Sequence, residues 1–113
     1  MKRIILEMGM GADLYGEDYT KAACRAVDDA IRHSSLLLFR SLDLPHENMQ
    51  VNVTVGVQSP EDVNCAEVAA KLPRGKAQVQ AVHGGQNIRH DEFGTVSVIA
   101  SVAIEALYPF DDK

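Results

Sequence analysis

A short segment near the N-terminus holds the densest group of residues that could do chemistry. Gly9, Gly11 and Gly16 surround Asp13 and Tyr15 in the order Gly-x-Gly-x-Asp-x-Tyr-Gly. A glycine-rich turn between a strand and a helix can bring backbone N–H groups to a ligand, and the helix N-terminus adds positive potential. We therefore expect the three glycines to bind a ligand, with Asp13 and Tyr15 as polar catalytic contacts. The alternative is a structural turn in which Asp13 caps locally.

The spacing of these glycines excludes two familiar phosphate-binding motifs. The dinucleotide fingerprint needs Gly-x-Gly-x-x-Gly directly at the helix, and a P-loop needs a following Gly-Lys-Ser/Thr. Neither pattern occurs in the segment. The motif therefore does not identify a nucleotide cofactor, and the sequence names no other.

A histidine supplies the first candidate for acid–base chemistry. His83 ends a predicted strand, directly before Gly84 and Gly85, and an imidazole can exchange a proton near neutral pH. The alternative is a strand-end histidine whose ring is bound by backbone groups. His90 and Asp91 are adjacent in the following polar segment, and we expect both to be solvated.

Basic residues cluster around one proline and one glycine in the middle of the chain. Lys71, Arg74 and Lys76 flank Pro73 and Gly75. In an acidic protein such a patch can seat a carboxylate or a phosphate, so Arg74 and Lys76 are candidate anion ligands. The alternative is a solvated turn in which Lys71 meets the C-terminal end of a helix dipole.

The elements that must position these residues follow from hydrophobic periodicity. Strands are predicted at 2–8, 49–57, 76–83 and 95–106, helices from Asp18 to about Leu42 and from Ser59–Pro60 to Leu72, a turn at 9–16 and a polar loop at 84–94. The order β-α-β-α-β-β predicts a single α+β domain over residues 1–113. We expect a two-layer sandwich, with a four-stranded mixed sheet and two helices on one face.

The second face of that sheet is unusual because it lacks charge. Its predicted members are all uncharged: Gln50, Asn52, Thr54, Gln78, Gln80, Thr95, Ser97, Ile99, Ser101 and Ala103. A solvated sheet face usually carries charges that discourage aggregation. The pattern favours burial against another subunit, where unpaired charges would be costly. A neutral but solvated face is the alternative.

Composition supports assembly and excludes several classes of partner. The apolar residues are mostly small, with 13 Ala and 12 Val against six aromatic residues. The net charge of −5 and the absence of a basic stripe argue against nucleic-acid and membrane-surface partners. The start of the chain is too weakly apolar for a signal peptide. Cys24 and Cys65 have no zinc-binding spacing and are interpreted as reduced core residues, so we expect a cytoplasmic protein.

Three resemblances bear on these expectations. The segment from Gly9 to Gly16 resembles an uncharacterised bacterial and plant family marked by Gly-x-Gly-x-Asp-x-His-Gly, with Tyr15 at the histidine position. The methylerythritol cyclodiphosphate synthases have a similar segment whose Asp and His bind a divalent metal, and here only Asp13 carries over. The element order with one bare sheet face resembles the trimeric chorismate-mutase-like group, which implies sheets packed around a threefold axis and ligand sites between subunits.

Together these features predict a homo-oligomeric enzyme or binding protein for a small, anionic metabolite. Its sites would lie between subunits near residues 9–16. The alternatives are a non-catalytic assembly module and a divalent-metal enzyme that uses Asp13.

Overall fold

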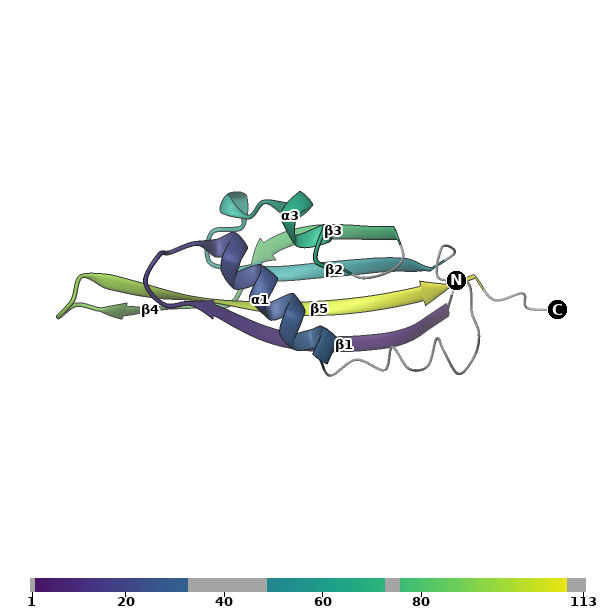
Figure 1. Cartoon of the computed structure of the whole chain (residues 1–113), viewed down its shortest axis with the longest axis horizontal. Helices are drawn as coiled ribbons and strands as arrows, with labels where there is room; N and C mark the ends of the chain where they lie inside the picture. The colour runs from purple at the N-terminus through teal and green to yellow at the C-terminus, as the bar shows by residue number, and fades with distance from the viewer. Residues whose placement is uncertain (1, 33–48, 73–75, 110–113) are drawn as a thin grey trace.

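The computed structural model describes residues 2–32, 49–72 and 76–109 of this chain. They form a mixed α+β fold with a single sheet (Figure 1). The elements in chain order are β1 (Lys2–Asp13), α1 (Tyr19–Arg32), β2 (Gln50–Val57), the 3-10 helix η2 (Pro60–Asp62), α3 (Cys65–Ala69), β3 (Lys76–His83), β4 (Gln86–His90) and β5 (Thr95–Tyr108). The predicted α+β class is confirmed.

The sheet has five strands where four were predicted. Its main path runs β1-β5-β2-β3, and β4 pairs with β5 beyond the end of β2. β2 and β3 are parallel, as expected for strands joined by a helical crossover, whereas β5 is antiparallel to β1, β2 and β4. The long strand β5 is therefore the spine of the fold, because every strand except β3 pairs with it.

The core lies between one face of this sheet and the helices. Alternating residues of β2 and β5 supply buried valines and alanines, such as Val53, Val55 and Ala100, and α1 adds Ala26 and Val27. These side chains are small because α1 sits very close to the sheet. Asp18 begins α1 as predicted, since its Oδ1 accepts a hydrogen bond from the backbone N–H of Lys21 at 3.0 Å. The predicted continuation of this helix to Leu42 lies outside the described residues.

The second helix is shorter than predicted and begins elsewhere. Pro60 starts only the short helix η2, and the Ser59 side chain makes no capping hydrogen bond. The cap is Asn64, whose Oδ1 accepts from the backbone N–H groups of Ala66 and Glu67 at 3.1 and 3.2 Å. α3 then packs its buried Val68 into the same core as α1, so both helices cover one face of the sheet, as expected.

The prediction of a polar loop at 84–94 was wrong, because most of this segment belongs to a β-hairpin. β4 pairs with the start of β5, from Gln86 opposite Ile99 to His90 opposite Thr95. The two strands form a hairpin arm that extends beyond the helices (Figure 1). Periodicity missed β4 because only one of its five residues is even half-buried, which leaves no alternation to detect.

Glycines allow the chain to pass from β3 to β4 across the end of β2. A β-carbon on Gly84 would lie 3.1 Å from the Cα of Gly56. Gly85 has a positive φ of 62° and a β-carbon there would strike the carbonyl of Ile99. The glycine pair that follows His83 is thus explained by close backbone approach.

Candidate functional site

Two of the glycines singled out above lie in a strand and face a helix. β1 continues through residues 9–13, so the predicted turn begins only after Asp13. A β-carbon on Gly9 would lie 2.5 Å from the carbonyl oxygen of Ala26, and one on Gly11 would strike the backbone of Ala26 and Ala22. Gly9 and Gly11 therefore let α1 lie directly on β1. This packing accounts for both glycines without any ligand.

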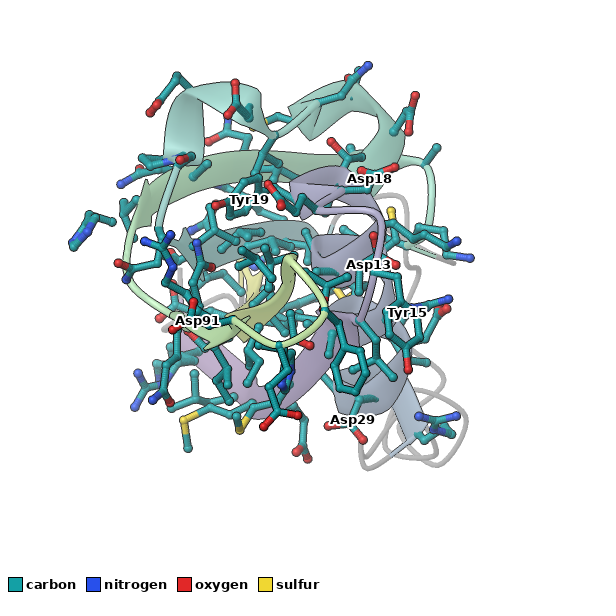
Figure 2. The ribbon with its side chains drawn as sticks, turned by 90° about the vertical axis from the view of Figure 1, so that its left-hand side faces the viewer. Asp13, Tyr15, Asp18, Tyr19, Asp29 and Asp91 are labelled. Carbon is teal, nitrogen blue, oxygen red and sulfur yellow. The ribbon has the colours of Figure 1, made fainter. Side chains whose placement is uncertain are left out.

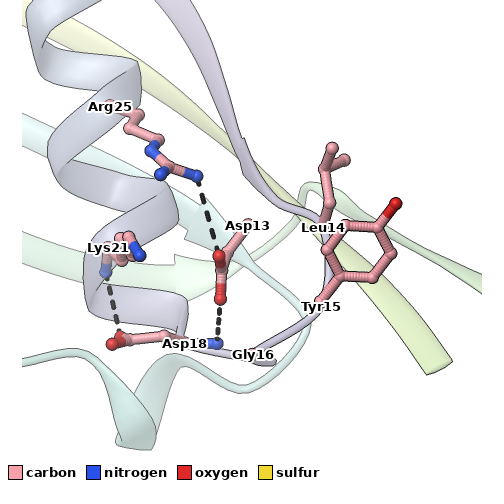
Figure 3. A pocket seen from close by; sticks show the side chains of 7 residues that line it. All are labelled: Asp13, Leu14, Tyr15, Gly16, Asp18, Lys21 and Arg25. Atoms are coloured by element: carbon pink, nitrogen blue, oxygen red, sulfur yellow. Dashed lines mark hydrogen bonds and ion pairs between the residues drawn. The ribbon is translucent and has the colours of Figure 1, made fainter.

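Asp13 holds the junction between β1 and α1 together. Its carboxylate is buried, and its Oδ2 accepts a hydrogen bond from the backbone N–H of Asp18 at 3.0 Å. Its Oδ1 lies 3.6 Å from Nη1 of Arg25, which also donates to the carbonyl of Ala12 at 2.6 Å. The carboxylate is thus shared between the start of the helix and a cation further along it (Figure 3).

The loop above Asp13 is tight. A β-carbon on Gly16 would lie 2.7 Å from Oδ2 of Asp13, so this third glycine leaves room for the carboxylate. Glu17 follows with a φ of 52°, in the left-handed region that residues other than glycine rarely adopt. Such strain costs about 1–2 kcal/mol and often accompanies functional loops.

The loop and the first turns of α1 line an open depression of about 450 Å³. We call it the junction depression, and its lining residues are Asp13, Leu14, Tyr15, Gly16, Asp18, Lys21 and Arg25. Both acids already accept backbone hydrogen bonds, Asp13 from Asp18 and Asp18 from Lys21. The ammonium of Lys21 has no carboxylate partner among the described residues.

Lys21 and Arg25 were not predicted as site residues from the sequence. They are four residues apart in the predicted helix, so they share one side of it. This spacing, directly after the cap residue Asp18, is a signal that could have pointed to them. Their approach to Asp13 depends on how α1 crosses β1 and could not be read from the sequence.

The ring of Tyr15 does not face the carboxylate of Asp13. The two residues lie on the same flank of the molecule (Figure 2). The ring of Tyr15 stands beside Leu14 and points away from the carboxylate (Figure 3), and 77% of the residue is exposed. The structure therefore places Tyr15 at the outer rim of the depression.

The hairpin arm is fastened to this loop by side-chain hydrogen bonds. Ser97 is buried, and its hydroxyl donates to the carbonyl of Leu14 at 3.1 Å. Nε2 of His90 lies 3.1 Å from the same hydroxyl. Nδ2 of Asn87 donates to the hydroxyl of Tyr19 at 2.8 Å. Both ends of the loop, at Leu14 and at the start of α1, are therefore tied to the arm.

The other predicted site residues lie elsewhere. His83 ends β3, on the edge of the sheet opposite to β1, which puts it roughly 14 Å from Asp13 across three strand spacings. Lys76 pairs with Gln50 at the far end of the sheet, about 30 Å along the strands from Asp13. Arg74 lies outside the described residues. The candidate anion ligand at 76 is thus not brought to the junction depression.

Metal-binding and thiol chemistry find little support in the described part of the chain. No group of three or more His, Cys, Asp or Glu side chains there is arranged to hold a metal ion. Asp13 faces Arg25 instead. Both cysteines are free thiols, and burial raises the pKa of Cys24 although the nearby Lys71 acts in the opposite direction. No described helix has the length and apolar character needed to cross a membrane.

Comparisons with known proteins place this architecture in a family. A crystal structure of an FtsZ-like protein of unknown function from Nostoc punctiforme is 37% identical to this chain. The match has a TM-score of 0.83 and covers 96% of this chain and 97% of that one. No curated protein matches the chain. The family model for the conserved hypothetical proteins called Lin0512_fam matches residues 3–106. The chain belongs to this family.

Proposed function

We propose that this protein binds a small anionic metabolite in the junction depression. The observation that carries the proposal is the pairing of Lys21 and Arg25 on one side of α1, facing a loop whose acids are already occupied. A phosphate or carboxylate there would meet two cations and the N-terminal end of a 14-residue helix. The strained backbone at Glu17 also favours a functional loop.

Lys21 and Arg25 have different roles in this proposal. Arg25 already contacts Asp13 and the carbonyl of Ala12, so its first role is to hold the loop. Lys21 has no carboxylate partner among the described residues and is free to meet a ligand. We propose Lys21 as the primary anion contact, with Arg25 as a fixed positive neighbour and Tyr15 at the rim.

Other expectations from the sequence stay part of this proposal. The depression is open on its outer side, which is consistent with a site completed by a second subunit in a homo-oligomer such as a trimer. Catalysis in the depression would use Asp13 or Tyr15, which line it, whereas His83 would need a ligand long enough to reach the end of β3. The proposal places the protein in the cytoplasm, where the free thiols of Cys24 and Cys65 stay reduced.

Anion titration followed by NMR tests the proposal. Inorganic phosphate and succinate are titrated into isotope-labelled protein at constant ionic strength. The expected result is saturable shifts at the backbone amides of residues 16–25. Lys21→Gln should weaken the affinity about 5–10-fold, which corresponds to about 1–1.4 kcal/mol.

The matched control is Arg89→Gln. Arg89 lies on the hairpin arm, its side chain is 80% exposed, and the substitution removes the same charge. The affinity should stay unchanged in this variant. Equal weakening by both substitutions would reveal a general charge effect and refute the site, and so would the absence of shifts at residues 16–25.

A non-catalytic assembly module is the second candidate. The observation that favours it is the packing of Gly9 and Gly11 against α1, which explains two of the five motif residues by folding alone. Under this function, no anion would perturb the junction depression, although the protein would still self-associate.

A further inference from the structure

The sheet face opposite to the helices is the largest feature that the proposed site does not use. We call it the open face. By register it contains the residues that alternate with the core residues, namely Leu6, Met8, Met10 and Ala12 of β1, Ser97, Ile99, Ser101 and Ala103 of β5, Asn52, Thr54 and Gly56 of β2, Gln78, Gln80 and Val82 of β3, and Gln86 and Ile88 of β4. None of these side chains is ionisable. The face does continue to ionisable residues at its ends, because the register places Glu105 opposite Leu6 and Asn52, and His90 opposite Thr95.

An apolar strip runs along this face. Met8 is 70% exposed and Met10 63% exposed, and Leu6 and Ile88 are also exposed. These four make up most of the exposed large hydrophobic residues of the described chain, the others being Leu14, Tyr15 and Phe93. Beside Met8 and Met10 lies a shallow depression of about 600 Å³ that reaches Val82 and Ala103, and Asp29 of α1 and His83 also line it. Exposed apolar surface that is contiguous in this way marks an interaction site.

A polar strip flanks the apolar one and is made of amides. Nε2 of Gln50 donates to Oδ1 of Asn52 at 3.2 Å, and Nδ2 of Asn52 donates to Oε1 of Glu105 at 3.4 Å. The charge of Glu105 is met within the same chain by Arg3, at 3.5 Å. The amides of Gln78 and Gln80 continue the strip on β3.

We propose that the open face is buried against the open face of a second copy of this chain. Amide side chains carry both a donor and an acceptor, so an amide strip can hydrogen-bond to an identical strip. A partner of opposite charge would find no ionisable group in the central part of the face. Two copies of a chain with a net charge of −5 repel each other elsewhere, and here they can meet without bringing like charges into contact.

The extent of the face suits such an interface. Four strands spaced about 4.8 Å apart and about nine residues long cover roughly 500–600 Å² in plan. The side chains and the hairpin arm add to this area. A stable interface takes about 800 Å² of accessible surface from each partner, which is within reach of this face.

The apolar strip also leads to the proposed anion site. It continues along β1 from Met8 and Met10 towards Leu14, whose side chain is exposed and lines the junction depression. A second copy seated on the strip would therefore border the open side of that depression. The assembly itself does not depend on anion binding.

Molar mass in solution tests the proposal. Light scattering after size exclusion, at about 5–100 µM protein, should give the wild type a mass that is a multiple of 12.3 kDa. The double variant Met8→Lys with Met10→Lys should run at 12.3 kDa. Both methionines are well exposed, so the chain should still fold, and circular dichroism checks this.

Phe93→Lys is the matched control. Phe93 is 77% exposed at the tip of the hairpin arm, off the open face, and the change adds the same kind of charge. This variant should keep the wild-type mass. The association constant should not fall between about 0.05 and 0.5 M NaCl, because the centre of the contact contains no ion pair and salt screens the repulsion between two copies with a net charge of −5.

Three results would overturn the proposal: a wild-type monomer at the highest concentration, a methionine double variant that keeps the wild-type mass, or a loss of assembly in Phe93→Lys alone. The outcome is separable from that of the proposed function. Lys21→Gln should leave the molar mass unchanged, so anion binding can be lost while assembly is kept. The opposite case, loss of assembly with anion binding kept, would be seen in the Met8→Lys with Met10→Lys variant.

Discussion

Asp13 and Arg25 join the end of the first strand to the second turn of the helix that follows. Oδ1 of Asp13 lies 3.6 Å from Nη1 of Arg25, while Oδ2 of the same carboxylate accepts the backbone N–H of Asp18 at 3.0 Å. One buried carboxylate thus sets the angle at which the chain leaves β1 and enters α1. The proposed anion site exists only because this contact holds the loop in place.

Replacing Asp13 should therefore destabilise the fold. Asp13→Ala leaves the Asp18 N–H without its acceptor and removes the carboxylate that pairs with Arg25, and the expected loss is about 2 kcal/mol in the free energy of unfolding. Asp13→Asn should lose about half as much, because an amide oxygen can still accept from Asp18. Urea unfolding followed by circular dichroism measures both. Asp91→Ala, at a side chain that is 93% exposed, is the control and should leave the midpoint unchanged.

The packing of α1 on β1 predicts a strong effect at Gly11. A methyl group there meets the helix backbone, which cannot move aside without losing its own contacts. We expect Gly11→Ala to cost about 3 kcal/mol or more. Gly94 offers a comparison, because its φ is 63° but a β-carbon at this position would have no neighbour within 4 Å. Gly94→Ala should cost only about 1 kcal/mol. Equal losses at the two positions would contradict the packing explanation.

The hydroxyl of Ser97 links the hairpin arm to the site loop, and its removal should loosen that loop. Ser97→Ala leaves the carbonyl of Leu14 without this donor, and the expected cost is about 1–2 kcal/mol. Amide hydrogen exchange should become several-fold faster at residues 14–16. Ser101→Ala, an exposed serine on the same strand, should change neither quantity. Unchanged exchange in Ser97→Ala would show that the arm does not support the loop.

The thiol of Cys24 should react slowly with alkylating reagents. Burial raises its pKa, so the folded protein holds less thiolate than an unfolded chain at the same pH. The folded protein binds the thiol proton of Cys24 more tightly than the unfolded chain does. The free energy of unfolding should therefore decline as the pH rises past the ordinary thiol pKa of about 8.5. Alkylation mapped by mass spectrometry from about pH 7 to about pH 10, with and without urea, measures the shift. A native rate profile that matches the unfolded one would refute it.

Local patterns in the sequence were sufficient for much of the fold. The alternation of Val51, Val53 and Val55 predicted β2 and the face that it buries, and the same reasoning predicted β3 and β5 closely. Asp18 was recognised as a helix cap because capping depends on residues within one turn. Alternation also assigned the uncharged Asn52, Thr54 and Ser101 to the second sheet face, but that prediction left out Glu105, which the register places on the same face.

Tertiary structure decided the rest, because those features depend on contacts between segments far apart in the chain. Gly9 and Gly11 suggested a ligand-binding turn, yet glycine is needed at both positions because α1 passes directly over them. β4 has no pattern of its own and exists because β5 offers it a pairing edge. Met8 and Met10 become an exposed strip only when the register of β1 on β5 turns them away from the helices. The sequence determined which faces of the strands are buried, and the packing of helix on strand determined which residues meet at the site.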